Sequence, residues 1–276
     1  MKKTAKWAFA LLLLVAVTVA AAGCGSQPAS QQQSQAASQA PRTITVASDT
    51  TYAPFEYQDK DTGKYVGFDI DLMDAIGKIN NWQINWRSMN FDGIVPALQS
   101  SSVDAAISAM TIKPDREKVV NFSIPYYQSG QSIMVLKKNT GIKGWDDLKG
   151  KKIGVQLATT GADLANKVPN AKVTTYDNID DAFLALENGN IDAVVNDYPV
   201  NAYYIVQGHN DVQLVGGLQT TEFYGIAVPK DKPDILAKVN SALKTLKDNG
   251  QFAQIYQKWF GKQPPDFLPG QPPANQ

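Results

Sequence analysis

The chain has 276 residues, of which 43% are apolar and 19% charged. It is therefore long enough for one large domain or two smaller ones, and apolar enough to bury a core. The 26 basic and 26 acidic residues give a formal net charge of zero, which excludes a strongly basic surface for nucleic acid. Cys24 and His209 are the only cysteine and histidine, which excludes an intrachain disulfide and a Cys/His zinc site. We expect His209, which lies in a polar run, to be a solvated loop residue.

The N-terminal residues 1–23 have the pattern of a secretory signal. Three lysines precede an apolar run at 7–22, and small residues then lead to Cys24. This arrangement resembles a bacterial lipobox, with Ala21 at the position where Leu is usual. We expect a lipoprotein signal peptide, and a lipidated Cys24 that anchors the protein outside the cell membrane. The alternatives are an ordinary secretory signal with an incidental cysteine, and a retained membrane anchor, for which the apolar run is short.

Two terminal stretches have compositions that do not favour packing. Residues 24–41 are rich in Gln and Ser and uncharged, and residues 262–276 are rich in Pro. We therefore expect a flexible tether before the folded part and a flexible tail after it.

Between these stretches, short β-branched or apolar runs alternate with segments of helical spacing. Strands are expected at 43–47, 55–57, 65–68, 82–86, 103–107, 152–155, 173–176 and 191–195. Helices are expected at 69–78, with Asp69 as N-cap, and at 91–99, 160–167, 179–186 and 199–206. This alternation predicts parallel sheets with helices on both faces.

The two halves of the chain contain a weak internal echo. Ala97-Leu98 is followed by Asp104-Ala105, and Ala185-Leu186 by Asp192-Ala193 at the same spacing. Each copy fits a helix end, a turn and a strand, which indicates two α/β lobes, unless the similarity is chance. Polar residues follow both strands, where open α/β sheets bind their ligands.

Six motifs make the chain resemble the bacterial extracellular solute-binding proteins for polar amino acids. They are DTTYAPFEY (49–57), GFDIDL (67–72), TIKPDR (111–116), FSIPYY (122–127), DLKG (147–150) and IYQKWF (255–260), which together span 43–261. The resemblance implies a type II periplasmic binding protein-like fold, with two doubly wound α/β lobes joined by a two-strand hinge. It places lobe 1 at 42–125 and 226–261, lobe 2 at 131–221, and the hinge at 126–130 and 222–225.

An amino acid ligand brings a carboxylate, and a buried carboxylate needs charged or hydrogen-bonding partners. A guanidinium grips a carboxylate with two bonds, and Arg116 stands at the family's carboxylate-binding position. Thr111 should add its N–H and hydroxyl, and Thr160 and Gly161 begin a helix whose free N–H groups favour an anion. The alternatives are a surface pairing of Arg116 with its acidic neighbours, Asp115 or Glu117, and a plain helix start.

The ligand ammonium needs acceptors of its own. The resemblance implies Asp197 and the carbonyl of Ala109 as these acceptors. The alternative role for Asp197 is an N-cap for the next helix.

Five residues match the end of the family's pocket that receives the ligand side chain: Asp49, Tyr52, Phe91, Gln156 and Asn196. The aromatic faces can sandwich a flat amide or guanidinium, unless Phe91 is plain core. Gln156 and Asn196 stand where glutamine binders have Lys and His, which leaves Asp49 without a counter-ion. This favours arginine or lysine, with glutamine next, although the stretch 89–98 looks more like glutamine binders.

The resemblance also implies the partners. We expect a monomer that delivers its amino acid to an ABC importer permease, with membrane contact through the lipid anchor only, no nucleic acid, no metal and no cofactor. One alternative is a cell-surface enzyme on the same fold, a dehydratase or a peptidoglycan lyase, with Asp49 or Glu56 as acid or base. The other is a receptor input domain, which the absence of a membrane helix or signalling domain after residue 261 disfavours.

Overall fold

The computed structural model describes residues 40–273. The predicted signal peptide, Cys24 and the tether as far as residue 39 lie outside these residues. Within 40–273, no helix is both long and apolar enough to cross a membrane.

The first of two five-stranded sheets has the order β5-β1-β6-β15-β7. Its strands are β1 (Arg42–Ser48), β5 (Trp82–Ser88), β6 (Ala105–Ala106), β7 (Val120–Phe122) and β15 (Ala227–Pro229). Helices cover both faces of this sheet. Side chains alternate between the two faces along β1, so its residues pack against helices on either side. Ile44 and Val46 pack into the core shared with α1 (Phe68–Asn80), α7 (Pro233–Asp248) and α8 (Gln251–Phe260), whereas Ala47 packs with α2 (Phe91–Gln99).

The second sheet has the order β11-β10-β12-β9-β13 and the same construction. Its strands are β9 (Gln131–Leu136), β10 (Lys152–Gln156), β11 (Lys172–Tyr176), β12 (Ala193–Asp197) and β13 (Val212–Val215). Val195 packs with α4 (Thr160–Ala165) on one face, and its neighbour Val194 packs with α5 (Ile179–Glu187) and α6 (Tyr198–Val206) on the other. A 3-10 turn, η1 (Trp145–Leu148), precedes β10.

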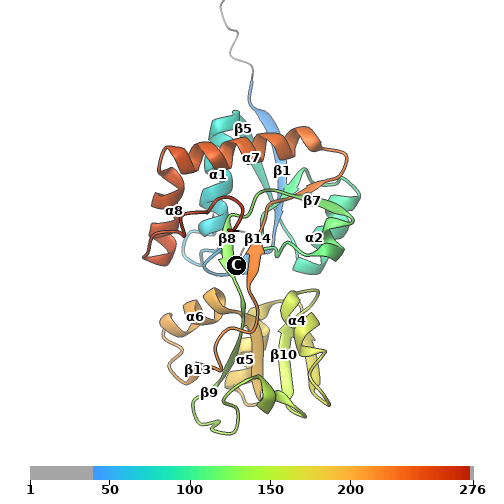
Figure 1. The fold of residues 1–276 in the computed structure, drawn as a ribbon, viewed down its shortest axis with the longest axis vertical. Coiled ribbons are helices and arrows are strands. Elements are labelled where there is room, and N and C mark those ends of the chain that lie inside the picture. The colour runs from blue at the N-terminus through green and yellow to red at the C-terminus, as the bar shows by residue number, and fades with distance from the viewer. Residues whose placement is uncertain (1–39, 274–276) are drawn as a thin grey trace, which may run out of the picture. The chain divides into compact units, whose positions relative to one another are not determined.

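Two antiparallel strands, β8 (Tyr127–Ser129) and β14 (Glu222–Tyr224), connect the sheets. The chain leaves the first sheet after β7, enters the second at β9, and returns from β13 to β15. Figure 1 shows β8 and β14 side by side between the two groups of helices and strands. The fold is therefore two α/β lobes joined by two strands, as the sequence predicts, and lobe 1 is discontinuous.

The remaining elements of lobe 1 lie near the connection. The strands β2 (Thr51–Tyr52), β3 (Glu56–Gln58) and β4 (Tyr65–Val66) form a small antiparallel sheet, which contains the predicted hairpin. The short helix α3 (Pro114–Glu117) follows the loop after β6.

The sheets are mixed, whereas the sequence predicts parallel ones. In the first sheet β1, β5 and β6 are parallel, but β15 is antiparallel to β6 and β7. In the second, β9 is antiparallel to both of its neighbours. The reason is the connectivity: the chain enters β9 and β15 from the connecting strands, at the edge where the parallel strands end.

Asp69 is not an N-cap, contrary to the prediction. The helix α1 begins one residue earlier, and Gly67 occupies the N-cap position with φ 139°. A side chain at Gly67 would place its Cβ 2.0 Å from the carbonyl oxygen of Phe55. Only glycine fits this close approach, so the backbone fixes the helix start, and Asp69 is turned into the lobe interior.

The predicted flexible tail is packed over its described part, 262–273. Leu268 is buried against lobe 1, the N–H of Gly270 donates to the carbonyl oxygen of Pro125, and Lys247 donates to the carbonyl oxygen of Phe267. The many prolines of this segment led to the prediction of flexibility. The prediction was wrong because the apolar side chains of Phe267 and Leu268 pack against lobe 1.

Candidate functional site

A small cavity of about 20 Å³ lies where the carboxyl ends of β1, β6, β10 and β12 converge from the two lobes. Its lining residues are Asp49, Tyr52, Phe91, Ser108, Ala109, Thr111, Arg116, Gln156, Thr159, Thr160 and Asp197. The structure thus brings together nine of the residues that the sequence singles out. The other two, Gly161 and Asn196, lie behind this lining.

Gly161 and Asn196 do not line the cavity but contact residues that do, or the sheet next to it. A Cβ at Gly161 would lie 2.9 Å from Gln131 Oε1 and 3.0 Å from the carbonyl oxygen of Val195, so glycine lets α4 approach the sheet closely. Asn196 Oδ1 accepts a 2.7 Å hydrogen bond from the hydroxyl of Tyr52.

Arg116 forms the positive part of the cavity. It is buried on α3, and its Nη1 and Nη2 donate to the carbonyl oxygens of Thr111 and Ala158, at 2.9 and 3.0 Å. Its guanidinium also lies over the ring of Phe91, 5.0 Å from the centroid. Among the ion pairs of residues 40–273, none includes Arg116, and Asp115 pairs with Lys118 instead. A buried guanidinium with donors to spare is a site for an anion.

Asp197 forms a negative part of the cavity. Gln131 Nε2 donates to Asp197 Oδ1, and the Tyr224 hydroxyl donates to Oδ2. Although Asp197 occupies the N-cap position of α6, its side chain makes no capping bond. Burial and the nearby carboxylate of Glu222 raise the pKa of Asp197 to about 7. A buried carboxylate without a cationic partner favours a cationic ligand group.

Glu222 is a buried acid that the sequence analysis assigned only to the hinge. Its Oε2 accepts 2.8 Å hydrogen bonds from the hydroxyls of Thr111 and Thr160, and its Oε1 accepts one from Thr220 at 2.9 Å. The Thr111 hydroxyl, expected at the ligand carboxylate, therefore faces Glu222 in this structure, as does the hydroxyl of Thr160. In the sequence, the one feature that could have indicated this role is that Glu222 is the only acidic residue of its connecting strand.

Three further residues at the site were not predicted as contacts. Ser108 and Thr159 line the cavity, and Gln131 bridges Thr160 and Asp197. Gln131 is 1% exposed, and a polar amide two residues before the apolar run 133–136 was the signal for it.

Asp49 forms a second negative part, 3% exposed. Its Oδ1 accepts from the Thr51 hydroxyl at 2.8 Å and its Oδ2 from Gln156 Nε2 at 2.6 Å. Burial raises the pKa of Asp49, and no ion pair of residues 40–273 includes it. Within residues 40–273, Asp49 therefore has hydrogen-bond donors but no cationic side chain as a partner.

Hydrogen bonds join the lobes around the cavity. Gln156 of lobe 2 donates to Asp49 of lobe 1, and Arg116 donates to Ala158. Farther out, Lys113 Nζ lies 2.5 Å from Asp163 Oδ2. The lobes therefore meet around the cavity.

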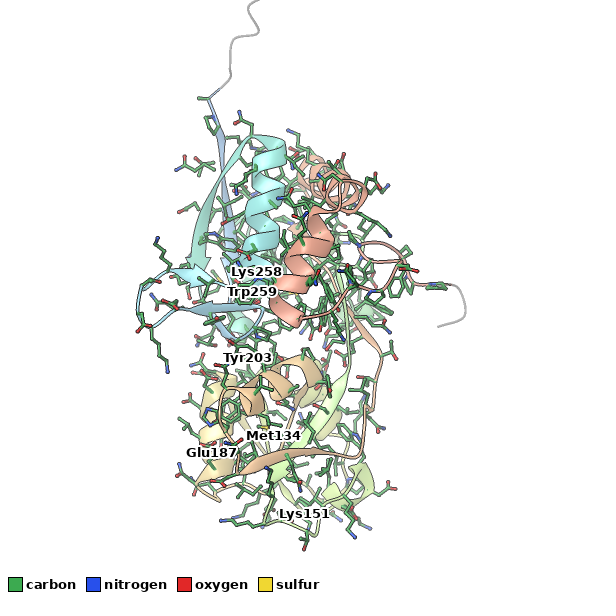
Figure 2. The ribbon with its side chains drawn as sticks, turned by 90° about the vertical axis from the view of Figure 1, so that its left-hand side faces the viewer. Met134, Lys151, Glu187, Tyr203, Lys258 and Trp259 are labelled. Atoms are coloured by element: carbon green, nitrogen blue, oxygen red, sulfur yellow. The ribbon has the colours of Figure 1, made fainter. Side chains whose placement is uncertain are left out.

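A second lobe contact lies outside the cavity. The Tyr57 ring lies 6.4 Å from that of Tyr203 on α6 and 6.3 Å from that of Trp259 on α8. Figure 2 shows Tyr203 directly below Trp259 and Lys258. These rings add a rim of aromatic contact between the lobes.

His209 does not line this cavity and lies in a loop after α6, as predicted, with its side chain partly exposed. Its ring stacks on Tyr204 with centroids 3.6 Å apart, and its Nδ1 lies 2.7 Å from Glu187 Oε1. Within the described part of the chain, no cluster of three or more His, Cys, Asp or Glu residues could hold a metal ion.

The model of the bacterial extracellular solute-binding proteins, family 3, matches residues 44–262. The chain therefore belongs to this family, whose name places its members outside the cytoplasm.

Named relatives and a solved structure agree with this assignment. The chain is 34% identical to the "Probable histidine-binding protein" of Neisseria gonorrhoeae over 94% of this chain and 96% of the relative. It is 32% identical to the "ABC transporter glutamine-binding protein GlnH" of Bacillus subtilis (strain 168), over 93% and 95%. "An ancestral arginine-binding protein bound to arginine" is 44% identical with a TM-score of 0.77, over 80% of this chain and 100% of that structure. The relatives carry names of binding proteins and differ in the amino acid named.

Proposed function

We propose that this protein is the substrate-binding component of an ABC importer for polar L-amino acids, and that it binds arginine or lysine in preference to glutamine. One observation supports this most strongly: Arg116, Asp197 and Asp49 are buried around one cavity, and within the described part of the chain none of them is in an ion pair. A buried charge is costly unless it is paired. A zwitterion with a cationic side chain supplies one partner for each of the three.

Each charge has a role in this proposal. Arg116 binds the ligand carboxylate, and Asp197 with the Ala109 carbonyl binds the ammonium. The N–H groups of Thr111, Thr160 and Gly161 support the carboxylate. Asp49 binds the cationic end of the side chain, held in place by Gln156, while Tyr52 and Asn196 close the wall beside it. Phe91 supports the Arg116 guanidinium from below.

Of the two acid/base candidates for an enzyme, Glu56 lies outside the cavity. Glu56 is fully buried and hydrogen-bonded to Ser108, and it does not line the cavity. Asp49 alone remains at the cavity surface, and its two oxygens already accept hydrogen bonds.

Calorimetry with arginine, lysine and glutamine on the wild type and Asp49→Asn tests the specificity. Loss of a buried opposite charge costs about 2–5 kcal/mol, so arginine and lysine should weaken by roughly 30-fold or more. Glutamine exchanges one acceptor for another and should lose about 1 kcal/mol. Tighter glutamine binding by the wild type, with little change in the mutant, would contradict the proposal.

Two control variants sharpen this measurement. Arg116→Ala should weaken all three ligands by roughly 30-fold or more, because each has the same carboxylate. Asp61→Asn removes a carboxylate from an exposed turn and should leave all three affinities unchanged.

We further propose that Cys24 carries a lipid that holds the protein at the membrane. This rests on the sequence of residues 1–24. Cys24→Ala should release the protein from the membrane fraction, and equal membrane association of mutant and wild type would overturn the anchor.

A further inference from the structure

Behind the floor of the cavity lie two carboxyl groups that the binding scheme does not use. Glu56 on β3 and Asp69 on α1 are both completely buried. No ion pair of residues 40–273 includes either of them. Two adjacent buried carboxylates would repel each other strongly, so something must neutralise the pair.

The hydrogen bonds show how the pair is neutralised. The Ser108 hydroxyl donates to Glu56 Oε1 at 2.9 Å, and the Ala109 N–H and the Tyr126 hydroxyl donate to Asp69 Oδ2, both at 2.8 Å. The remaining oxygens, Glu56 Oε2 and Asp69 Oδ1, are buried and receive no donor from the rest of the described protein. Their other oxygens accept from the consecutive residues Ser108 and Ala109, which holds the two carboxyl groups close together. Two neighbouring buried carboxyl groups without a cation are tolerated when one of them carries a proton.

The hydrogen bonds favour Glu56 as the side chain that carries the proton. Asp69 accepts two hydrogen bonds from other groups and Glu56 accepts one, which favours the charged form of Asp69. Burial, followed by the charge of Asp69, raises the pKa of Glu56 well above its usual range, whereas burial raises that of Asp69 only to about 6, so Asp69 is the charged partner above that pH. The other ionisable groups near the pair are Asp49, Tyr52 and Tyr126, and none of them is a cation.

The pair holds the segments that form the cavity floor. The Ser108 hydroxyl also accepts from the N–H of Asp49 at 2.9 Å. Ala109 has the left-handed value φ 43°, uncommon for a residue with a Cβ, and its N–H bond to Asp69 supports this conformation. The pair is thus connected to Asp49 and to the loop from Ser108 to Thr111.

We propose that Glu56 and Asp69 share a single proton, and that this proton positions the loop from Ser108 to Thr111 for ligand binding. The positioning role rests on the proposed function, whereas the shared proton does not. Both are positioning residues, because neither lines the cavity.

A set of amide variants tests the one-proton arrangement. In Glu56→Gln the amide can donate to Asp69 and accept from Ser108, which imitates the protonated acid. In Asp69→Asn the amide can donate to Glu56 and accept from Ala109 and Tyr126. In the double variant two NH₂ groups face each other, so one amide must turn and lose its donors. Glu117→Gln, on an exposed side chain, is the control.

Calorimetry with L-arginine at pH 7 measures the positioning. Each single variant should bind within about threefold of the wild type, whereas Glu56→Ala and the double variant should bind at least tenfold more weakly, as expected for a lost buried hydrogen bond. Equal affinities for the double and single variants would overturn the positioning role. So would a Glu56→Gln variant as weak as Glu56→Ala.

Denaturant unfolding of the ligand-free protein between pH 6.5 and 8, above the pKa of about 6 of Asp69, measures the proton itself. The native wild type keeps a proton that an unfolded glutamate releases, so its unfolding constant should rise tenfold per pH unit relative to that of Glu56→Gln. The Glu117→Gln variant should follow the wild type. Parallel pH curves for the wild type and Glu56→Gln would overturn the shared proton. Because this measurement needs no ligand, it stays informative if no amino acid binds.

Discussion

Asp197 connects ligand binding to pH at the scale of a single residue. Its pKa of about 7 in this structure is set first by burial and then by Glu222. A bound ammonium favours the ionised carboxylate, so binding below pH 7 must expel a proton. Affinity should therefore increase with pH up to about 7, by up to tenfold per unit.

Calorimetry at pH 5, 6, 7 and 8, in two buffers of different ionisation enthalpy, checks this directly. The buffer dependence at pH 6 should report proton release on binding. The variant Asp197→Asn should bind more weakly at pH 7 and show a flatter pH profile. Affinity that is equal at pH 5 and pH 7 in the wild type would contradict this role.

The same residue has an effect on stability. Burial raises the pKa of Asp197 above the value of an unfolded aspartate, so the native state keeps a proton that the unfolded chain releases. Its contribution to the free energy of unfolding is greatest below about pH 4, and it is lost as the pH rises to about 7. Function and stability therefore respond to pH in opposite directions at this site.

At the scale of the element, the start of α1 depends on Gly67. Gly67→Ala adds a Cβ 2.0 Å from the carbonyl oxygen of Phe55, at a φ of 139° that side chains rarely adopt. We expect a loss of about 2–4 kcal/mol in the free energy of unfolding.

Gly63→Ala is the matched control, measured in the same denaturant titration. Gly63 also has a positive φ, 67°, but no atom lies within 4 Å of an added Cβ, so only the backbone penalty of about 1 kcal/mol remains. Equal losses in the two variants would show that steric contact does not determine the helix start.

Elements with a clear period were predictable, and those defined by tertiary contacts were not. The helix Phe91–Gln99 was predicted with its bounds, because Phe91, Ile94 and Leu98 repeat at helical spacing. Asp69 was misassigned because an acid before an apolar run also fits an N-cap, and the limit set by Phe55 on Gly67 is not visible in the sequence. The packed segment at Leu268 was missed for the same reason.

The residues of the site also fall into those that the sequence predicts and those that it does not. Strand ends and motif positions identified Asp49, Arg116 and Asp197 before their contacts were known. Glu222 and Gln131 were missed because they reach the site through the crossing of the two lobes, a contact between residues distant in sequence.

At the scale of the whole folded part, the lobes meet around the cavity, and a ligand that touches both must favour this arrangement. We propose that residues 126–130 and 222–225, which include β8 and β14, act as the hinge. Solution scattering should show a smaller radius of gyration with saturating arginine than without it.

Arg116→Ala, mixed with the same arginine concentration, should retain the radius of the free protein. The ion pair of Lys113 and Asp163 closes with the lobes, but its exposed position limits its contribution to about 1 kcal/mol or less. Asp163→Asn should therefore shift the radius of the free protein only slightly. Calorimetric binding without any decrease in radius would contradict hinge closure.

The double crossing of the chain also determines an order of folding. In the first sheet β7 pairs only with β15, and β15 is the strand that joins it to β6. This sheet therefore cannot be completed until the chain has reached Pro229, and its helical cover requires α7 and α8 as well. The second sheet has all its strands once Val215 has appeared. The lobe that begins second is thus the first that can finish folding, while the strands β6 and β7 wait for β15, which is encoded more than a hundred residues later.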